Sequence, residues 1–242
     1  MKSAESLLQE GINALRESDS HIDRIINPRC EEITNLLSRY MNEIELFNPA
    51  YGLVGVKDRE ELAVKHILDS VAPLGIISRL LEQAHPAGAA HPAGAAKHPA
   101  QIADAGSGAG LPGIPLAITL PDCRFSLIER MSRRAGFLWN VKAALNLSNV
   151  TVEESELEKS KPDRFALVTF RAFKPLEPKL LSVLFKICAR GGIIAAYKGK
   201  QKKTEEETAR LIKNSEEKIN WETIPYTVPF LNEERRMLII RL

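Results

Sequence analysis

The chain has 242 residues, of which 44% are hydrophobic and 26% are charged, as is typical of a globular protein with a buried core. The 33 basic and 31 acidic side chains give a net charge of +2, which excludes an acidic disordered protein and one that is basic throughout. No apolar run approaches the roughly 18 residues of a membrane span, and the polar N-terminus lacks the apolar segment of a signal peptide. Three widely spaced cysteines without a CxxC pair indicate reduced thiols, so we expect a cytoplasmic protein.

The first 47 residues have the apolar periodicity of helices. From Ile33, apolar side chains recur at offsets of 3, 4, 7, 11 and 14 residues, which places them in one stripe along a helix. The Asn27–Pro28 pair predicts a break between helices, and Asn48–Pro49 predicts the end of the last one. We therefore expect residues 1–47 to be a helical extension packed on a main domain of residues 48–242.

Residues 58–84 again have helical spacing, with His66 and Asp69 among the apolar positions. On spacing alone, a structural role is the more common one for such a histidine. Residues 85–100 then read HPAGAAHPAGAAKHPA, where the prolines exclude a continuous helix and the small residues offer little to bury, so we expect an inserted loop. Its histidines are six and seven residues apart, which matches no metal-ligand pattern, and no metal is expected.

Strands and helices alternate from residue 101 onward. This order predicts an α/β fold with a mostly parallel, doubly wound sheet and helices on both faces. Only a short loop connects the last two strands, so they can form an antiparallel pair at the edge of the sheet. The expected strands are 101–104, 124–128, 149–152, 165–170, 193–197, 219–225 and 237–241, and the expected helices are 111–120, 131–146, 176–189 and 204–215.

The most informative segment is a Gly-rich turn after the first of these strands, which reads IADAGSGAGLPGIP over residues 102–115. A turn of this kind between a strand and a helix lets a ligand approach the backbone at the helix N-terminus. Counted from Gly108, the glycines match the dinucleotide pattern GxGxxG. Counted from Asp104, they give DxGxGxG, with an acidic residue at the end of the strand.

The position of Asp104 separates these two interpretations. A dinucleotide places its pyrophosphate over the turn, where a carboxylate would repel it. S-adenosylmethionine carries a sulfonium, an amino group and a ribose but no phosphate, so it suits a turn that contains an acid. Glu129 ends the next strand, 25 residues later, where it can accept hydrogen bonds from both ribose hydroxyls. A P-loop is excluded because no Gly-Lys-Ser/Thr sequence follows.

Five strings occur in a fixed order along the chain: KHILDS at 65–70, DAGSGAGLPGIP at 104–115, RAF at 171–173, KG at 198–199 and ERR at 234–236. Together they resemble the methyltransferase G family of the small ribosomal subunit, also called glucose-inhibited division protein B, over about residues 48–242. The resemblance implies a class I, Rossmann-like methyltransferase that uses S-adenosylmethionine. It also implies methylation of N7 of one guanine in the 530 loop of 16S ribosomal RNA.

The same resemblance implies roles for individual residues. Arg171, His66 and Asp69 are the expected positioning residues, and Lys65 stands where the family usually has arginine. The expected cofactor-binding residues are Asp104, Gly106, Ser107, Gly108, Leu111, Glu129, Leu157, Glu158 and Arg171.

Methyl transfer to guanine N7 makes modest chemical demands. N7 presents a lone pair and carries no proton, so no general base is needed, and we expect catalysis by positioning and electrostatics. Because positive charge moves onto the guanine, Arg171 would be a poor neighbour for the ring. An interaction of this arginine with a phosphate or with the cofactor carboxylate is expected instead.

The small net charge hides a segregated distribution. Residues 124–142 hold five basic side chains against Glu129 alone, and residues 190–203 hold five with no acid. Ligands bind beyond the carboxyl ends of parallel strands, so cations that follow strand ends should contact RNA phosphates around the cofactor cleft. The expected RNA-binding residues are Arg130, Arg133, Arg134, Lys174, Lys198, Lys200 and Arg235.

The expected partner is therefore 16S rRNA in the small ribosomal subunit, bound by a monomer. Two other functions stay open: a methyltransferase of the same fold that acts on a small molecule or a protein, and a non-catalytic ribosome-binding protein that kept the fold. The basic rim argues against the first. The intact glycines between Asp104 and Glu129 argue against the second, and a nicotinamide dehydrogenase is a distant third.

Overall fold

A computed structural model describes residues 2–84, 99–172, 176–213 and 220–241 of the chain. The loop expected at 85–100 lies outside the described residues apart from its last two positions, and Lys174 lies outside them as well.

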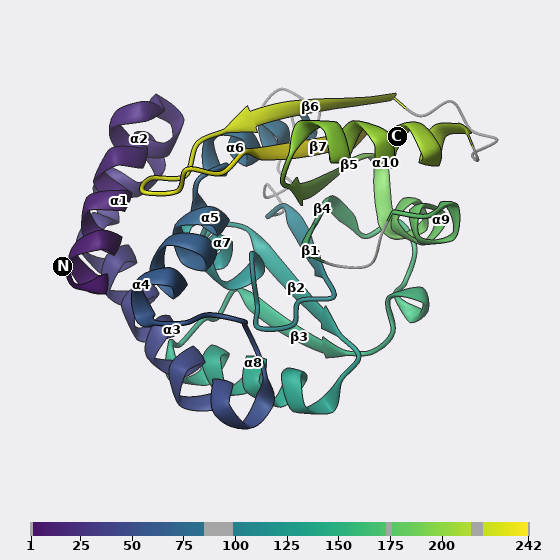
Figure 1. Ribbon diagram of the computed structural model, residues 1–242. Coiled ribbons are helices and arrows are strands. Elements are labelled where there is room, and N and C mark those ends of the chain that lie inside the picture. Colours follow the sequence, from purple (N-terminus) through teal and green to yellow (C-terminus); the bar gives the residue numbers. More distant parts are fainter. Residues whose placement is uncertain (1, 85–98, 173–175, 214–219, 242) are drawn as a thin grey trace, which may run out of the picture.

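A sheet of seven strands forms the centre of the molecule (Figure 1), in the order β3-β2-β1-β4-β5-β7-β6. β1 to β5 run parallel, whereas β7 pairs antiparallel with both β5 and β6. The predicted doubly wound sheet with an antiparallel edge is thus confirmed. The strands are β1 (Gln101–Ala105), β2 (Arg124–Glu129), β3 (Val150–Glu154), β4 (Phe165–Arg171), β5 (Cys188–Lys198), β6 (Asn220–Tyr226) and β7 (Arg235–Arg241).

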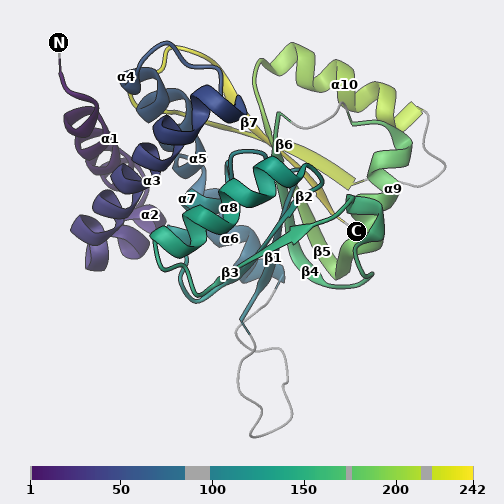
Figure 2. The same ribbon diagram turned by 90° about the horizontal axis from the view of Figure 1, so that it is seen from below.

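Helices cover both faces of this sheet (Figure 2). On one face, the N-terminal helices α1 (Ala4–Ser18), α2 (Ser20–Ile26) and α3 (Cys30–Tyr51) share an apolar cluster with α6 (Leu74–Ala84), α7 (Gly113–Thr119) and α8 (Ser132–Ala144). On the other face, α9 (Pro178–Ile187) and Leu211 of α10 (Gln201–Lys213) pack on alternate strand residues. A 3₁₀ turn η1 (Asn27–Arg29) separates α2 from α3, which confirms the predicted break.

Helix α3 continues past Asn48–Pro49, so the predicted helix end was wrong. A proline in the last turn of a helix removes a single backbone donor and need not stop it. The helix ends at Tyr51, where Gly52 adopts the left-handed conformation with φ of 58° and donates its N–H to the Asn48 carbonyl at 2.9 Å. Glycine at this cap position is what terminates the helix.

Residues 58–84 form several short helices rather than one. α4 (Arg59–Leu62) leads into a six-residue π-helix, η2 (Ala63–Leu68), and then into α5 (Asp69–Val71), before Pro73 separates α5 from α6. π-helical turns are rare and are frequent at functional sites. This one lies within the KHILDS string, which apolar spacing could not reveal.

Strand β5 begins at Cys188, well before the predicted start at residue 193. The Gly191–Gly192 pair was expected to stop the preceding helix, but it lies inside the strand, where Gly191 has φ of 74°. The pairing with β4 shifts register between Phe165 and Leu167. A left-handed glycine allows this local irregularity of the strand, as in a β-bulge.

The helical extension is tied to the Gly-rich turn through Tyr40 of α3. This side chain is 0% exposed, and its hydroxyl donates a hydrogen bond to the Ala109 carbonyl. A Cβ atom on Gly110 would come within 3.2 Å of the same hydroxyl. The N-terminal helices therefore hold the turn from the inside of the protein.

Tyr40→Phe should destabilise the fold by about 1–3 kcal/mol, because the buried Ala109 carbonyl loses its donor while the ring still fills its space. Urea unfolding checks this, with Tyr51→Phe in the same helix as the matched control. Equal stability of Tyr40→Phe and the natural protein would contradict this role of the hydroxyl.

Candidate functional site

The Gly-rich turn connects β1 to α7 at the carboxyl edge of the sheet. Gly106, Gly108 and Gly110 all have positive φ, at 69°, 57° and 87°, a conformation that other residues adopt only with strain. At Gly113 a Cβ atom would lie 2.4 Å from Leu127 and 2.6 Å from Asp104, so the helix must approach the sheet without a side chain there. A Cβ on Gly108 would meet no atom closer than 3.9 Å, which leaves this part of the turn open to a ligand.

Asp104 lies beneath the turn at the end of β1. Its carboxylate is 1% exposed, and Oδ2 accepts a hydrogen bond from the Gly113 N–H at 3.0 Å. The other oxygen, Oδ1, has no hydrogen-bond partner among the residues that the structure describes. Burial raises the pKa of Asp104 to about 7. The site thus contains a buried acceptor that a ligand with donors or positive charge would satisfy.

Glu129 brings a second carboxylate to the same turn from the end of β2. It is 4% exposed; Oε2 accepts from the Gly108 N–H at 2.9 Å, and Oε1 accepts from the Met131 N–H at 2.9 Å. Each oxygen keeps a further lone pair. The two oxygens are therefore held in a fixed orientation and can accept from a pair of vicinal hydroxyls.

The remaining residues expected at the cofactor lie around these two acids. Ser107 donates its hydroxyl to the Asp104 carbonyl at 2.9 Å, and Leu111 is 6% exposed. Leu157, in the 3₁₀ turn η3 (Leu157–Lys159), packs in the same apolar cluster as Ile128, whereas Glu158 is exposed. A surface depression of about 380 Å³ lies alongside, lined by Arg130, Glu156, Glu158 and Lys179.

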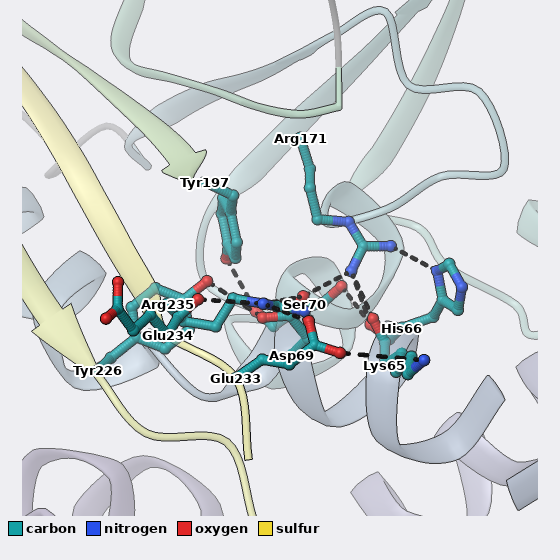
Figure 3. Close-up of polar contacts among 10 residues, drawn as sticks. All are labelled: Lys65, His66, Asp69, Ser70, Arg171, Tyr197, Tyr226, Glu233, Glu234 and Arg235. Carbon is teal, nitrogen blue, oxygen red and sulfur yellow. Dashed lines mark hydrogen bonds and ion pairs between the residues drawn. The ribbon is translucent and has the colours of Figure 1, made fainter. Parts of the chain in front are cut away.

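A second group of polar side chains centres on Asp69 (Figure 3). Asp69 is 4% exposed, and its Oδ2 pairs with Arg171 at 3.3 Å and with Arg235 at 3.2 Å, while Oδ1 accepts from the Tyr226 hydroxyl at 3.1 Å. We call Asp69, His66, Arg171, Arg235 and Tyr226 the Asp69 cluster. It ties the helical segment after the π-helix to β4 and to the strands β6 and β7.

Arg171 binds the π-helix itself as well as Asp69. One nitrogen of its guanidinium donates to the Lys65 carbonyl at 3.1 Å and the His66 carbonyl at 3.4 Å, and the other lies 2.8 Å from Nδ1 of His66. Burial, followed by the charge of Arg171, lowers the pKa of His66 to about 4. The sequence identified His66, Asp69 and Arg171 as positioning residues only by resemblance, and it gave no signal for Tyr226. The hydroxyl of Tyr197 adds a further contact, since it donates to the Ser70 carbonyl at 2.8 Å.

The basic residues expected to bind RNA fall into two groups. Arg130, Arg133 and Lys200 are exposed and Arg134 is half-buried. Lys198 instead bonds both carboxylate oxygens of Glu207, at 2.8 and 2.9 Å, and Arg235 belongs to the Asp69 cluster. A carboxylate thus pairs with each of these two side chains, and their contact with RNA stays a prediction.

Comparison with known proteins identifies the family. A family model described as rRNA small subunit methyltransferase G matches residues 33–239. The chain is 40% identical over 222 residues to ribosomal RNA small subunit methyltransferase G of Treponema denticola, covering 86% of each protein. It is 35% identical over 242 residues to the protein of that name from Treponema pallidum, covering 98% of this chain and 94% of the relative. This chain belongs to the rRNA small subunit methyltransferase G family.

A solved structure supports the fold. A SAM-dependent methyltransferase from Aquifex aeolicus superposes with a TM-score of 0.51 at 15% identity, over 72% of this chain and 92% of that one. At this sequence identity, the similarity shows a shared fold and nothing more. It agrees with the strand order of the sheet and confirms the predicted class I methyltransferase architecture.

Within the described ranges, no helix is long and apolar enough to cross a membrane. The same residues include no group of three or more His, Cys, Asp or Glu side chains that could hold a metal ion.

Asp69→Asn should lower the free energy of unfolding by about 3 kcal/mol, because it leaves the largely buried Arg171 guanidinium without a counter-charge and leaves Arg235 with only the exposed Glu233. Glu233→Gln is the control, since Glu233 pairs with Arg235 at 3.0 Å from the surface side, and should cost less than about 1 kcal/mol. Denaturant unfolding measures both. Equal effects of the two substitutions would contradict the central position of Asp69.

Folding raises the pKa of the Asp104 carboxyl to about 7, so its ionised form is disfavoured in the folded state. In the ligand-free protein, the free energy of unfolding should therefore decrease as the pH rises from about 4 to about 7. The stability difference between Asp104→Asn and the natural protein should therefore shift in favour of the variant between pH 5 and pH 8. Urea unfolding at both pH values measures this difference, and the exposed Asp122→Asn is the control. A difference that does not change with pH would refute the assignment.

Proposed function

We propose that this protein transfers the methyl group of S-adenosylmethionine to N7 of a guanine in the 530 loop of 16S ribosomal RNA. We further propose that it acts in the cytoplasm as a monomer on the small ribosomal subunit, without a metal. The observation that carries the proposal is that the match to the rRNA small subunit methyltransferase G family spans residues 33–239 and includes an open Gly-rich turn between two buried carboxylates.

The donor set of the turn suits S-adenosylmethionine. Glu129 would accept from the ribose hydroxyls, and the backbone at Gly106 and Gly108 would lie against the cofactor where a side chain would intrude. Asp104 offers an acceptor oxygen without a partner to a ligand that carries ammonium and sulfonium charges. Ser107, Leu111, Leu157 and Glu158 complete the proposed binding site, and two acids at this place disfavour a pyrophosphate. We do not include Arg171, which was also expected there, because its guanidinium is engaged by Asp69 and the Lys65 carbonyl.

The cofactor supplies an activated methyl group on a positively charged sulfur. The protein has to hold the guanine so that N7 lies in line with that methyl, and N7 attacks with its lone pair without prior loss of a proton. Positioning therefore accounts for most of the catalysis. Arg171 pairs with Asp69 at 3.3 Å and contacts His66 at 2.8 Å, so a carboxylate offsets its charge and the guanidinium need not contact the guanine ring as that ring becomes positive.

The exposed cations would bind the RNA backbone. Arg130 and Arg133 follow the carboxyl end of β2, and Lys200 follows β5, so all three lie at the edge of the sheet where the cofactor is proposed to bind. Phosphate contacts of this kind orient the RNA without reading its sequence.

Methyl transfer from labelled S-adenosylmethionine tests the function, with small subunits, intact ribosomes and naked 16S rRNA as acceptors. We expect a single N7-methylguanine within the 530 loop. Glu129→Gln should bind the cofactor at least tenfold more weakly, because one of its two acceptor oxygens becomes a donor, whereas Glu153→Gln on the neighbouring strand should not. Label found only in protein, or at another atom of the RNA, would overturn the proposal.

Combined replacement of Arg130 and Arg133 by alanine should weaken binding to small subunits and lower the slope of log affinity against log salt by about one for each phosphate that the protein no longer neutralises. Arg124→Ala is the control, because Arg124 lies at the other end of β2 and donates to the Ser148 carbonyl at 3.3 Å. Filter binding at several salt concentrations measures the slope. An unchanged slope in the double variant would place the RNA elsewhere.

A further inference from the structure

The imidazole of His66 is fixed in one tautomer. A guanidinium nitrogen can only donate, so Nδ1 of His66, 2.8 Å from Arg171, must accept, and the proton of the neutral ring lies on Nε2. The ring is half-buried, and Nε2 has no hydrogen-bond partner among the residues that the structure describes. His66 therefore presents a single oriented N–H that has no acceptor within the described ranges of the chain.

The sheet order and the contact with Arg171 place the His66 ring relative to the Gly-rich turn. Glu129, the proposed ribose ligand, belongs to β2, and β1 with the Gly-rich turn comes next in the sheet, followed by β4. The pairing of β1 with β4 ends at Asp104 and Thr169, so Arg171 projects beyond the end of β1. Its guanidinium lies 2.8 Å from Nδ1 of His66, so the imidazole lies on the β4 side of the turn.

We propose that the Nε2–H group of His66 donates a hydrogen bond to the 6-oxo group of the target guanine and so selects guanine over purines that lack this oxygen. The inference rests on the proposed function, since N7 and O6 lie side by side on the same edge of guanine. A base that presents N7 to the methyl group also presents O6 to a donor next to the methyl-acceptor position.

A neutral donor suits this position better than a cation. Positive charge grows on the guanine during transfer, and it would be repelled by an imidazolium or by a guanidinium at the same distance. Arg171 and burial keep the ring neutral, and O6 becomes a weaker acceptor once N7 carries the methyl group. His66 should therefore act on recognition of the base, seen in KM, more than on kcat.

The test uses small subunits reconstituted with guanine, inosine or 2-aminopurine at the target position. Inosine keeps O6, whereas 2-aminopurine keeps N7 and lacks O6. The natural protein should methylate guanine and inosine at similar kcat/KM and 2-aminopurine roughly tenfold more slowly.

In His66→Ala, the kcat/KM for guanine should fall to that for 2-aminopurine, mainly through a higher KM. His66→Asn keeps a donor and should restore part of the preference for guanine. His21→Ala, a substitution of a histidine on α2, is the matched control and should leave all three values unchanged.

A natural protein that methylates no guanine would refute the proposed function itself. If it methylates guanine but His66→Ala keeps the preference over 2-aminopurine, the role of His66 is refuted and the function stands. A loss of S-adenosylmethionine affinity in both His66→Ala and His66→Asn would assign the ring to the cofactor and also overturn the inference.

Discussion

The ion pair between Asp69 and Arg171 is the constraint on which the acceptor side of this site depends. It joins two segments that lie far apart in the sequence, the helical turn after the π-helix and the end of β4, at 3.3 Å in surroundings with little solvent. Arg235 adds the last strand to the same carboxylate. Each of these two largely buried guanidinium groups is stabilised only while it stays paired with the buried Asp69 carboxylate. The cluster therefore fixes the positions of three elements at once.

The π-helix gives this cluster its geometry. The Arg171 guanidinium donates to the carbonyls of both Lys65 and His66 within this helix, at 3.1 and 3.4 Å. The same interaction sets the imidazole of His66 against Arg171. A rare backbone form thus places one donor at the edge of the turn, and Tyr40 fixes the other side of that turn from within the helical extension.

Much of this architecture could be predicted from the sequence because it follows from local patterns. The alternation of strands and helices, the DxGxGxG turn and the acid at the end of β2 each depend on a few neighbouring residues. The end of α3 could not be predicted from Pro49, because the stop is set by Gly52 and its left-handed backbone. The π-helix and the start of β5 depend on tertiary contacts, and the partners of Asp69 lie more than one hundred residues away. For the same reason, the sequence could not show that Lys198 and Arg235, both expected to bind RNA, each pair with a carboxylate in the folded chain.

The central proposal is that the two parts of the site have separate roles: the turn with Asp104 and Glu129 would bind the cofactor, and the Asp69 cluster would orient the acceptor. The most direct measurement compares Arg171→Lys with the natural protein for both S-adenosylmethionine affinity and methyl transfer at saturating cofactor. Lysine keeps the charge but cannot span the carbonyls, the carboxylate and the imidazole together. The account predicts a cofactor dissociation constant within about threefold of the natural value and a loss of methyl transfer of at least tenfold, with no such loss in Arg164→Lys just before β4. Parallel loss of cofactor affinity and activity in Arg171→Lys would contradict it.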